Sequence, residues 1–229
     1  MKQELLIGIT ESGVMHTDAD PPIPLETKFQ MVKESGVYDY FDKTPPLELE
    51  DDYRRCSEKY ELPILAGGWF YVLGRDEDLL MENLRLGARL GSLVHNTQIM
   101  MDHQDGSLVS DEQVVEIYLR AYETGEACGC RPTFEVHVNM WSEDFRRIEK
   151  VADLVEKQGI PFRMTLDHSH VIFKIDNPRE QEVFNIRESI ENGDLVLDPF
   201  QDNHVCGKWI DRGFVNHCHA RAAVPNNPR

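Results

Sequence analysis

Two short stretches of the sequence join an apolar run to carboxylate and imidazole side chains. In FEVHVNMW, Glu135 lies inside the apolar run and His137 follows it. In TLDHSHVIF, Asp167 closes the run, and His168 and His170 come directly after it. Carboxylates and imidazoles bind divalent metal ions and carry protons in enzymes. The two stretches therefore predict a metal site or an acid-base site where buried strands meet their loops.

A third stretch, FVNHCHAR, contains His217 and His219. Because side chains alternate along a strand, His217 and His219 lie on one face, as do Glu135 and His137 on theirs. A carboxylate costs several kcal/mol to bury alone, so Glu135 needs a cation or strong donors. The mixed set of Glu, Asp and His fits one divalent ion, Mn²⁺, Co²⁺, Mg²⁺ or Zn²⁺, with positions open to substrate oxygens.

Two other interpretations of these residues stay open. Glu135 can pair with a neighbouring arginine such as Arg163, with the histidines satisfied by backbone groups. A separate zinc site is a further alternative, because His204 stands close to Cys206 and Cys218 lies between two histidines.

Strand-like and helix-like segments alternate along the whole chain. Helix-like stretches separate nearly all of the strand-like runs, and Ser110 and Ser142 are candidate N-caps of two of these helices. Parallel strands need crossovers of this kind, so the order predicts an α/β fold with a parallel sheet. The strand-like runs are seven: 5–10, 37–44, 63–70, 92–101, 132–138, 161–170 and 213–224.

A TIM (β/α) barrel is the first choice of architecture, with residues 1–229 as one domain and seven strands in the chain. An open, doubly wound sheet is the second choice. No GxGxxG or GxxxxGK[ST] motif follows a strand, which favours the barrel over a nucleotide-binding open sheet. TIM barrels build their active sites at the carboxyl ends of their strands, where the carboxylates and histidines lie.

Charge and composition narrow the class of partner. The 229 residues carry a formal net charge of −17, which repels polyanions and favours cations and neutral small molecules, so nucleic acid is not expected as a partner. Five cysteines without CxxC spacing, and no secretory signal, predict a cytoplasmic protein. No apolar run approaches the roughly 18 residues of a membrane span.

FEVHVNMW, TLDHSH and VNHCHARA, in this order and spacing, resemble the xylose isomerase-like TIM-barrel superfamily of sugar isomerases and epimerases. The resemblance covers roughly residues 5 to 225. It implies that Glu135, Asp167 and His219 hold the metal, and that Glu135 also acts as general base. It further implies that His137 contacts substrate and accepts a proton.

The resemblance also implies that His170 and Arg221 bind substrate, with His168 as an alternative to His170. From its place at the end of a strand, Trp69 is a candidate to stack on the apolar face of a sugar; a place in the core is the alternative.

The sequence departs from the superfamily pattern at its end. The eighth strand and its metal-binding glutamate have no counterpart in the 229 residues. Asp102 and His103 in MMDHQDG are a possible substitute ligand source, or simply a solvated loop. An unclosed barrel exposes strand edges, so we expect a homo-oligomer.

The resemblance implies a metal-dependent isomerase or epimerase of ketoses or polyols, which moves a proton through an enediolate. One alternative is a lyase, dehydratase or C-glycoside deglycosidase-like enzyme acting on keto-sugars. Another is a non-catalytic barrel that binds a metal or a sugar. The DNA-repair endonuclease branch of the superfamily needs a basic surface, and the net charge argues against it.

Substitutions at the two carboxylates test the metal site. We expect Glu135→Gln and Asp167→Asn each to weaken metal binding by at least about tenfold, with an unchanged circular dichroism spectrum, because each removes a charged ligand. A substitution at Cys206 should leave metal affinity unchanged. Normal metal binding by both carboxylate variants would show that the assignment is wrong.

Overall fold

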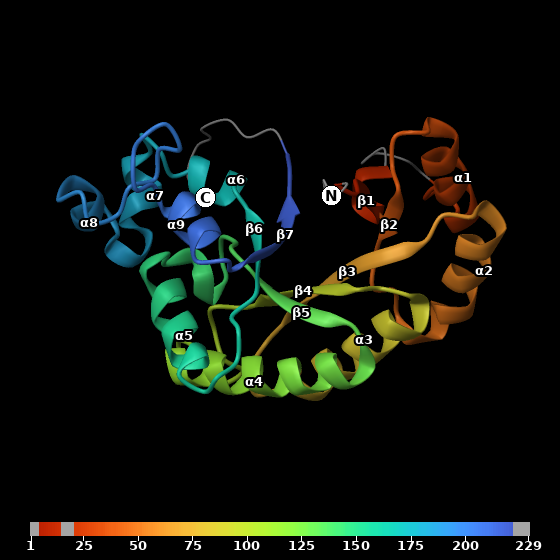
Figure 1. Ribbon diagram of the computed structural model, residues 1–229, viewed down its shortest axis with the longest axis horizontal. Coiled ribbons are helices and arrows are strands. Elements are labelled where there is room, and N and C mark those ends of the chain that lie inside the picture. Colours follow the sequence, from red (N-terminus) through yellow and green to blue (C-terminus); the bar gives the residue numbers. More distant parts are fainter. Residues whose placement is uncertain (1–4, 15–20, 222–229) are drawn as a thin grey trace. The chain divides into compact units, whose positions relative to one another are not determined.

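The computed structural model describes residues 5–14 and 21–221. Within these residues seven strands form one sheet, hydrogen-bonded in the order in which they occur along the chain (Figure 1). The pairs β1–β2, β2–β3, β5–β6 and β6–β7 are parallel. The strands are β1 (Gly8–Thr10), β2 (Tyr40–Asp42), β3 (Ile64–Tyr71), β4 (Val94–Ile99), β5 (Arg131–Glu135), β6 (Met164–Asp167) and β7 (Val215–His219).

Helices separate the strands, as the sequence predicts. The predicted α/β fold with a parallel sheet is therefore confirmed, with seven strands in the described part of the chain. The α-helices are α1 (Leu25–Ser35), α2 (Glu50–Tyr60), α3 (Glu77–Leu90), α4 (Asp111–Cys128), α5 (Arg146–Glu156), α6 (Ser169–Ile172), α7 (Pro178–Glu182), α8 (Arg187–Glu191) and α9 (Val205–Asp211), and the 3₁₀ turns are η1 (Glu11–Val14), η2 (Leu47–Leu49), η3 (Trp141–Glu143) and η4 (Val183–Asn185).

The chain divides into two compact units, and strands β3 and β4 contribute residues to both. The first unit comprises Met1–Trp69, Leu79–Asn96 and Tyr122–Arg131, and the second comprises Phe70–Asp78, Thr97–Ala121 and Pro132–Arg229. The prediction that residues 1–229 make one domain stays a prediction.

Each unit has an aromatic core. In the first, the rings of Phe29 on α1 and Phe41 on β2 stack with their centroids 4.4 Å apart. In the second, Tyr118 on α4 packs against Phe134 on β5 and against Phe162, with centroid separations of 5.0 and 5.2 Å. The Tyr118 hydroxyl donates to the Pro161 carbonyl at 2.7 Å. These contacts fix the start of β6 against α4 and so help to set where β6 ends.

The two serines predicted as N-caps behave differently. Ser110 caps α4 as expected: its hydroxyl accepts from the Gln113 amide, and the Gln113 side chain accepts from the Ser110 amide. Ser142 is not a helix cap, which corrects the prediction. Helix α5 begins only at Arg146, and the Ser142 hydroxyl is bonded back to the end of β5 instead.

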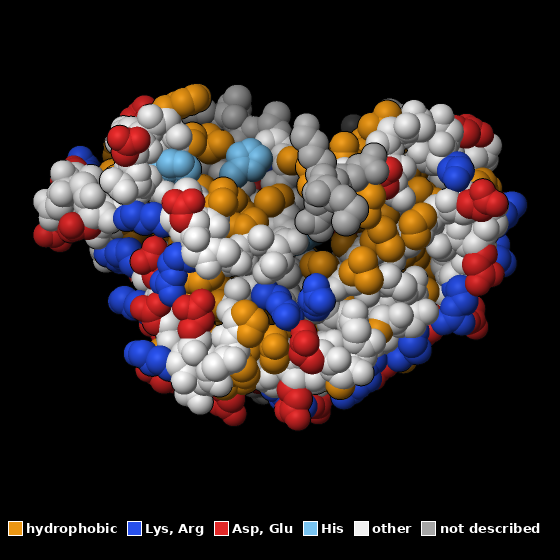
Figure 2. Space-filling view, in the orientation of Figure 1, with side chains coloured by type: hydrophobic (Ala, Val, Ile, Leu, Met, Phe, Trp, Pro, Cys, Tyr) orange, Lys and Arg blue, Asp and Glu red, His pale blue; other side chains and the backbone are white. Residues whose placement is uncertain are grey.

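Acidic and basic side chains lie intermixed on the face of the molecule shown in Figure 2. Arg187 illustrates the pattern, because it pairs with Glu182 and Glu191 at the surface. No helix among the described residues is both long enough and apolar enough to cross a membrane.

His95 on β4 offers a test of the first unit's core. Its side chain is fully buried, with Nδ1 3.2 Å from the Thr44 hydroxyl, and burial lowers its pKa to about 3. The unfolded chain takes up a proton on this ring near pH 6.5, whereas the folded chain does not. Stability is therefore fully present above pH 6.5 and falls as the pH drops towards 3.

We expect the free energy of unfolding to fall by about 1.4 kcal/mol per pH unit below pH 6.5 on account of His95. A His95→Asn variant should be less stable at pH 7 but should lose less stability between pH 7 and pH 5. Urea unfolding at pH 7, 6 and 5 measures both slopes. Equal slopes for the two proteins would contradict the assignment.

Candidate functional site

Three neighbouring strands of the second unit end on the residues that the sequence predicts as metal ligands. Glu135 is the last residue of β5, Asp167 of β6 and His219 of β7. In the parallel register of β6 and β7, Asp167 and His219 are directly paired. Because parallel strands present their carboxyl ends at one edge of a sheet, the three side chains meet there.

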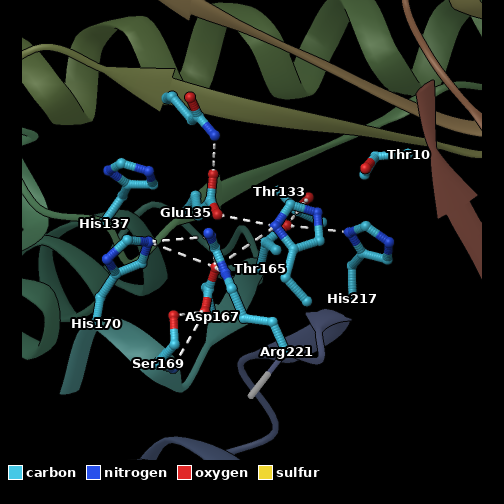
Figure 3. Close-up of polar contacts among 12 residues, drawn as sticks. Thr10, Thr133, Glu135, His137, Thr165, Asp167, Ser169, His170, His217 and Arg221 are labelled. Atoms are coloured by element: carbon cyan, nitrogen blue, oxygen red, sulfur yellow. Dashed lines mark hydrogen bonds and ion pairs between the residues drawn. The ribbon is translucent and has the colours of Figure 1, made fainter. Parts of the chain in front are cut away.

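Distances confirm that these side chains converge (Figure 3). The His219 Nδ1 atom lies 2.9 Å from Glu135 Oε1 and 4.0 Å from Asp167 Oδ2. One ligand atom from each of the three residues lies within 4.8 Å of the other two. Both carboxylates are buried, Glu135 at 1% and Asp167 at 0% exposure. The fold therefore brings the three predicted ligands together; their binding of a metal stays a prediction.

Several donors hold the Asp167 carboxylate in place. Its Oδ1 atom accepts from the amide and the hydroxyl of Ser169, at 3.0 and 2.6 Å. Its Oδ2 atom accepts from Arg221 Nε at 2.8 Å and lies 3.4 Å from His170 Nε2. Burial alone raises the pKa of Asp167, but hydrogen bonds from His170, Arg221 and Ser169 outweigh it and hold that pKa well below the usual range. Asp167 is therefore ionised at neutral pH.

The donors present fit a divalent cation. Two buried carboxylates and one imidazole suit borderline or hard ions such as Mn²⁺, Co²⁺, Mg²⁺ and Zn²⁺. Gln98 on β4 adds a second observation. Its amide nitrogen donates to Glu135 Oε2, while its amide oxygen is buried with no hydrogen-bond partner among the described residues. The site therefore contains a buried polar atom whose hydrogen-bonding capacity is unused among the described residues.

Two histidines stand beside the three ligands. The rings of His137 and His170 lie 3.9 Å apart between centroids, tilted by 44°. His137 Nδ1 lies 2.5 Å from the Val138 carbonyl oxygen. A carbonyl only accepts hydrogen bonds, so Nδ1 carries the proton and Nε2 the lone pair. Burial, followed by the charge of His170, lowers the pKa of His137, which keeps the ring neutral at pH 7.

Ser142 holds the segment between Glu135 and His137. Its hydroxyl donates to the Glu135 carbonyl at 2.6 Å and accepts from the His137 amide at 3.2 Å. The loop after β5 is thereby folded back onto the end of its own strand, which fixes both functional side chains relative to one another.

A buried ion-pair network joins this loop to the segment that carries His170. The Lys174 ammonium lies 2.9 Å from Glu143 Oε1 and 3.5 Å from Glu180 Oε2, and all three side chains are at most 1% exposed. The other Glu143 oxygen accepts from the Asn139 amide at 2.5 Å. Glu143 belongs to the loop after β5, and Lys174 lies two residues beyond α6, so the network connects the elements of the two stacked histidines.

A second row of polar side chains lies two residues earlier on the same strands. The hydroxyls of Thr133 and Thr165 are 2.7 Å apart, and Thr165 Oγ1 lies 3.4 Å from His217 Nδ1. Burial, and then the charge of His219, lowers the pKa of His217 to about 4, so this ring is also neutral at pH 7. The row links β5, β6 and β7 through side chains as well as through the backbone.

The remaining predicted residues lie in different settings. Arg221 follows β7 and faces Asp167 and His170. Trp69 lies on β3 in the first unit, 39% exposed, with the Lys43 ammonium 5.7 Å from its ring centroid. His168 precedes α6, and its neighbour His170 is the one that contacts Asp167.

Several residues offered as alternative ligands do not gather around the site. Asp102 and His103 lie in a loop closed by an antiparallel bridge between Asp102 and Leu108, and His103 faces Asp105. His204 caps α9 by accepting from the Gly207 amide. Burial raises the pKa of Cys206 to about 11, so its thiol stays protonated at neutral pH.

Sequence reasoning missed Gln98, Ser142 and the Lys174 network. Gln98 lies on the strand next to that of Glu135, but its strand-like run, SLVHNTQIMM, contains four further polar residues, so residue type alone does not single it out. No local pattern points to Lys174, because its partner Glu143 lies 31 residues away.

Comparisons with known proteins place the fold. No protein-family model matches the sequence, and no curated protein matches it. Among solved structures, the chain is similar to the IolI protein with a bound zinc atom, at 15% identity and a TM-score of 0.54, over 72% of this chain and 64% of that one. It is equally similar to D-allulose 3-epimerase from Methylomonas sp., at 14% identity and a TM-score of 0.54, over 73% and 64% of the two chains. The chain has the xylose isomerase-like TIM-barrel fold.

This result confirms the fold that the sequence motifs predict. At such low identity the likeness concerns the fold alone. The chain spans less than two thirds of the length of each of these xylose isomerase-like structures.

The Lys174 network gives a stability test. We expect Lys174→Met to lower the free energy of unfolding by about 3–5 kcal/mol, because it leaves two carboxylates buried without their cation. Adding Glu143→Gln to this variant should restore part of the loss, since it removes one of the two buried charges. Chemical denaturation measures both.

Arg187→Met is the matched control, since Arg187 also pairs with two glutamates but at the surface. It should change the free energy of unfolding by less than about 1 kcal/mol. A similar small effect for Lys174→Met would contradict the buried network.

Proposed function

We propose that the protein is a metal-dependent isomerase or epimerase that acts on ketoses, polyols or related small sugars. The observation that carries this proposal is the convergence of Glu135, Asp167 and His219 at the carboxyl ends of three adjacent parallel strands. The shared fold with a D-allulose 3-epimerase and with a zinc-bound IolI protein supports it. The net charge of −17 favours a cation and a neutral substrate over an anionic one.

Glu135, Asp167 and His219 would hold one divalent ion, Mn²⁺, Co²⁺, Mg²⁺ or Zn²⁺. When bound, such an ion acts as a Lewis acid and makes a carbon-bound proton beside a carbonyl group more acidic. Gln98 keeps the Glu135 carboxylate oriented, and Ser169 does the same for Asp167. The ligands are therefore positioned by the fold itself.

Glu135 and His137 would transfer protons. Glu135 is a buried carboxylate beside the place where substrate would lie, so it can take a proton from carbon as general base. His137 is neutral and has its Nε2 lone pair available, so it can accept a second proton and return it to a neighbouring oxygen or carbon. Two proton carriers in one site suit a reaction that moves hydrogen between adjacent carbons.

Substrate binding at this site would fall to His170 and Arg221, whereas the substrate contact predicted for Trp69, which belongs to the first unit, stays a prediction. His170 and the exposed Arg221 side chain both reach Asp167 and can donate hydrogen bonds to hydroxyl groups. Trp69 presents a partly exposed ring that can stack on the apolar face of a sugar. The cytoplasmic location and the homo-oligomer predicted from the sequence stay predictions.

A second candidate is elimination by a lyase, dehydratase or deglycosidase-like enzyme on keto-sugars. The contact between the His137 and His170 rings favours it, because it places two imidazoles beside Glu135. In such a reaction His137 would remove the proton and a neighbouring acid would protonate the leaving oxygen.

Deuterium exchange tests the proposed function. We expect the Mn²⁺- or Co²⁺-loaded protein, incubated in D₂O with ketoses and aldoses, to place deuterium on the carbon beside the carbonyl group, as measured by NMR. Glu135→Gln should abolish the exchange, since it removes the base. Arg187→Met is the control, because Arg187 pairs with two glutamates at the surface and has no role in the proposed site.

Exchange with isomerised or epimerised product would support the proposal. Release of water or an aglycone from keto-glycosides, without isomerisation, would favour elimination instead. Absence of exchange with every sugar, from a protein that binds metal, would overturn the enzyme proposal and leave a binding protein.

A further inference from the structure

We propose that Glu143 is a positioning residue, which acts through one peptide group to fix the ring nitrogen of His137 that carries the proton. The peptide group is the one that joins Val138 to Asn139. The consequence for catalysis rests on the proposed function, in which the Nε2 lone pair of His137 accepts a proton. The hydrogen bonding itself holds whether or not a sugar is turned over.

A chain of hydrogen bonds runs from Glu143 to the His137 ring. The Asn139 amide donates to Glu143 Oε2 at 2.5 Å. The Val138 carbonyl, at the other side of the same peptide group, accepts from His137 Nδ1, also at 2.5 Å. A trans peptide group is planar, and its N–H and C=O point in opposite directions, so an acceptor on the N–H sets the direction of the C=O. The Glu143 carboxylate therefore directs the Val138 carbonyl towards the imidazole.

The opposite orientation of this peptide group would reverse the tautomer. With the plane turned over, an N–H would face His137 Nδ1 in place of a carbonyl. An N–H only donates, so Nδ1 would have to keep its lone pair and the proton would move to Nε2. Asn139 has a φ of +65°, in the left-handed region that is uncommon for residues other than glycine, so its own preference does not secure the observed orientation. The Glu143 carboxylate stabilises it.

Other contacts fix where this peptide group lies. The Asn139 carbonyl accepts from the Met101 amide at 3.1 Å. The His137 amide donates to the Ser142 hydroxyl at 3.2 Å. These contacts hold the chain on both sides of the peptide group, but they do not use its own N–H or C=O. Its orientation is therefore set by the acceptor that Glu143 offers.

Lys174 holds the Glu143 carboxylate in the required direction. Its ammonium lies 2.9 Å from Glu143 Oε1, which leaves Oε2 for the Asn139 amide. Both charged side chains are fully buried, so the charge-assisted hydrogen bond to the amide is formed by a carboxylate shielded from water. A glutamine could not serve both partners. Because Lys174 only donates, the glutamine oxygen would turn to Lys174 and its NH₂ group would face the Asn139 N–H.

NMR measures the tautomer directly. We use the metal-free protein labelled with ¹⁵N-histidine at about pH 8, above the ordinary pKa of histidine. We expect the His137 proton on Nδ1 in the wild type and mainly on Nε2 in Glu143→Gln, where two donors would otherwise face each other at the peptide group. The signals that are lost from the spectrum of His137→Gln identify this ring.

Glu180→Gln is the matched control. Glu180 is the other buried carboxylate beside Lys174, at 3.5 Å, so the variant removes the same charge from the same network. It leaves the acceptor of the Asn139 amide in place, and His137 should therefore keep its proton on Nδ1. Urea unfolding compares the stability of the two variants. The same change of tautomer in both would show a general loosening and would overturn the inference.

A second substitution provides a rescue. In Glu143→Gln combined with Lys174→Met, no ammonium competes for the glutamine oxygen, which can then accept from the Asn139 amide. The His137 proton should return to Nδ1, although the network has lost a further member. A proton that stays on Nε2 in this double variant, or one that stays on Nδ1 in folded Glu143→Gln, would overturn the inference.

The wild type alone also tests the inference, independently of how the variants fold. Scalar couplings across hydrogen bonds should join the Asn139 nitrogen to the Glu143 carboxylate carbon, and His137 Nδ1 to the Val138 carbonyl carbon. Absence of either coupling, or a wild-type proton on Nε2, would overturn the inference and leave the proposed function standing.

Deuterium exchange tests the consequence for catalysis. Glu143→Gln should lower kcat by at least about tenfold and change KM by less than about twofold, because the Nε2 lone pair is lost while the substrate contacts remain. Glu180→Gln should keep both constants within about twofold of the wild type. A changed tautomer with an unchanged kcat would overturn the role in catalysis. Absence of exchange by the wild type would overturn the proposed function, and the NMR result would still decide whether Glu143 sets the tautomer.

Discussion

Burial of two carboxylates at the ends of adjacent strands is the constraint on which the rest of this site depends. Each of Glu135 and Asp167 would cost several kcal/mol if it were left without partners. The fold meets that demand from four directions: β4 supplies Gln98, β7 supplies His219, the turn after β6 supplies Ser169, and the segment after β7 supplies Arg221. The register of β5, β6 and β7 is therefore fixed in part by the hydrogen bonds that the two carboxylates accept at the strand ends.

Polar side chains occupy part of the interior beside these strands. Barrel interiors are generally filled by branched apolar side chains. Here Thr133, Thr165 and His217 form a hydrogen-bonded row behind the carboxylates. Such a row leaves no room for the strands to slip by one residue, because a slip would turn these groups towards the covering helices and bury them without partners. The row therefore specifies the strand register, but it places polar groups where apolar side chains could otherwise pack.

Much of this could be predicted from the sequence, since strand-helix alternation and residue type are local signals. Glu135, Asp167 and His219 stand at strand ends, and parallel topology brings such residues together. Other features could not be predicted from the sequence. The Lys174 network joins residues remote in sequence, and Ser142 looked like a helix cap because its hydroxyl has the same chemistry in either role. The segment from α7 to α8 is not one continuous helix, because Phe184 adopts a φ of +63°.

The ion pair between Lys174 and Glu143 has a consequence for motion. It joins the loop that carries His137 to the segment that carries His170, and the charged groups have no access to water while the structure is closed. Opening either segment alone would leave a buried charge separated from its ion-pair partner, so the two segments should open together. In hydrogen exchange their amides would then share one opening free energy and behave as a single cooperative unit. The two imidazoles would be present together or absent together, with no intermediate in which only one is in place.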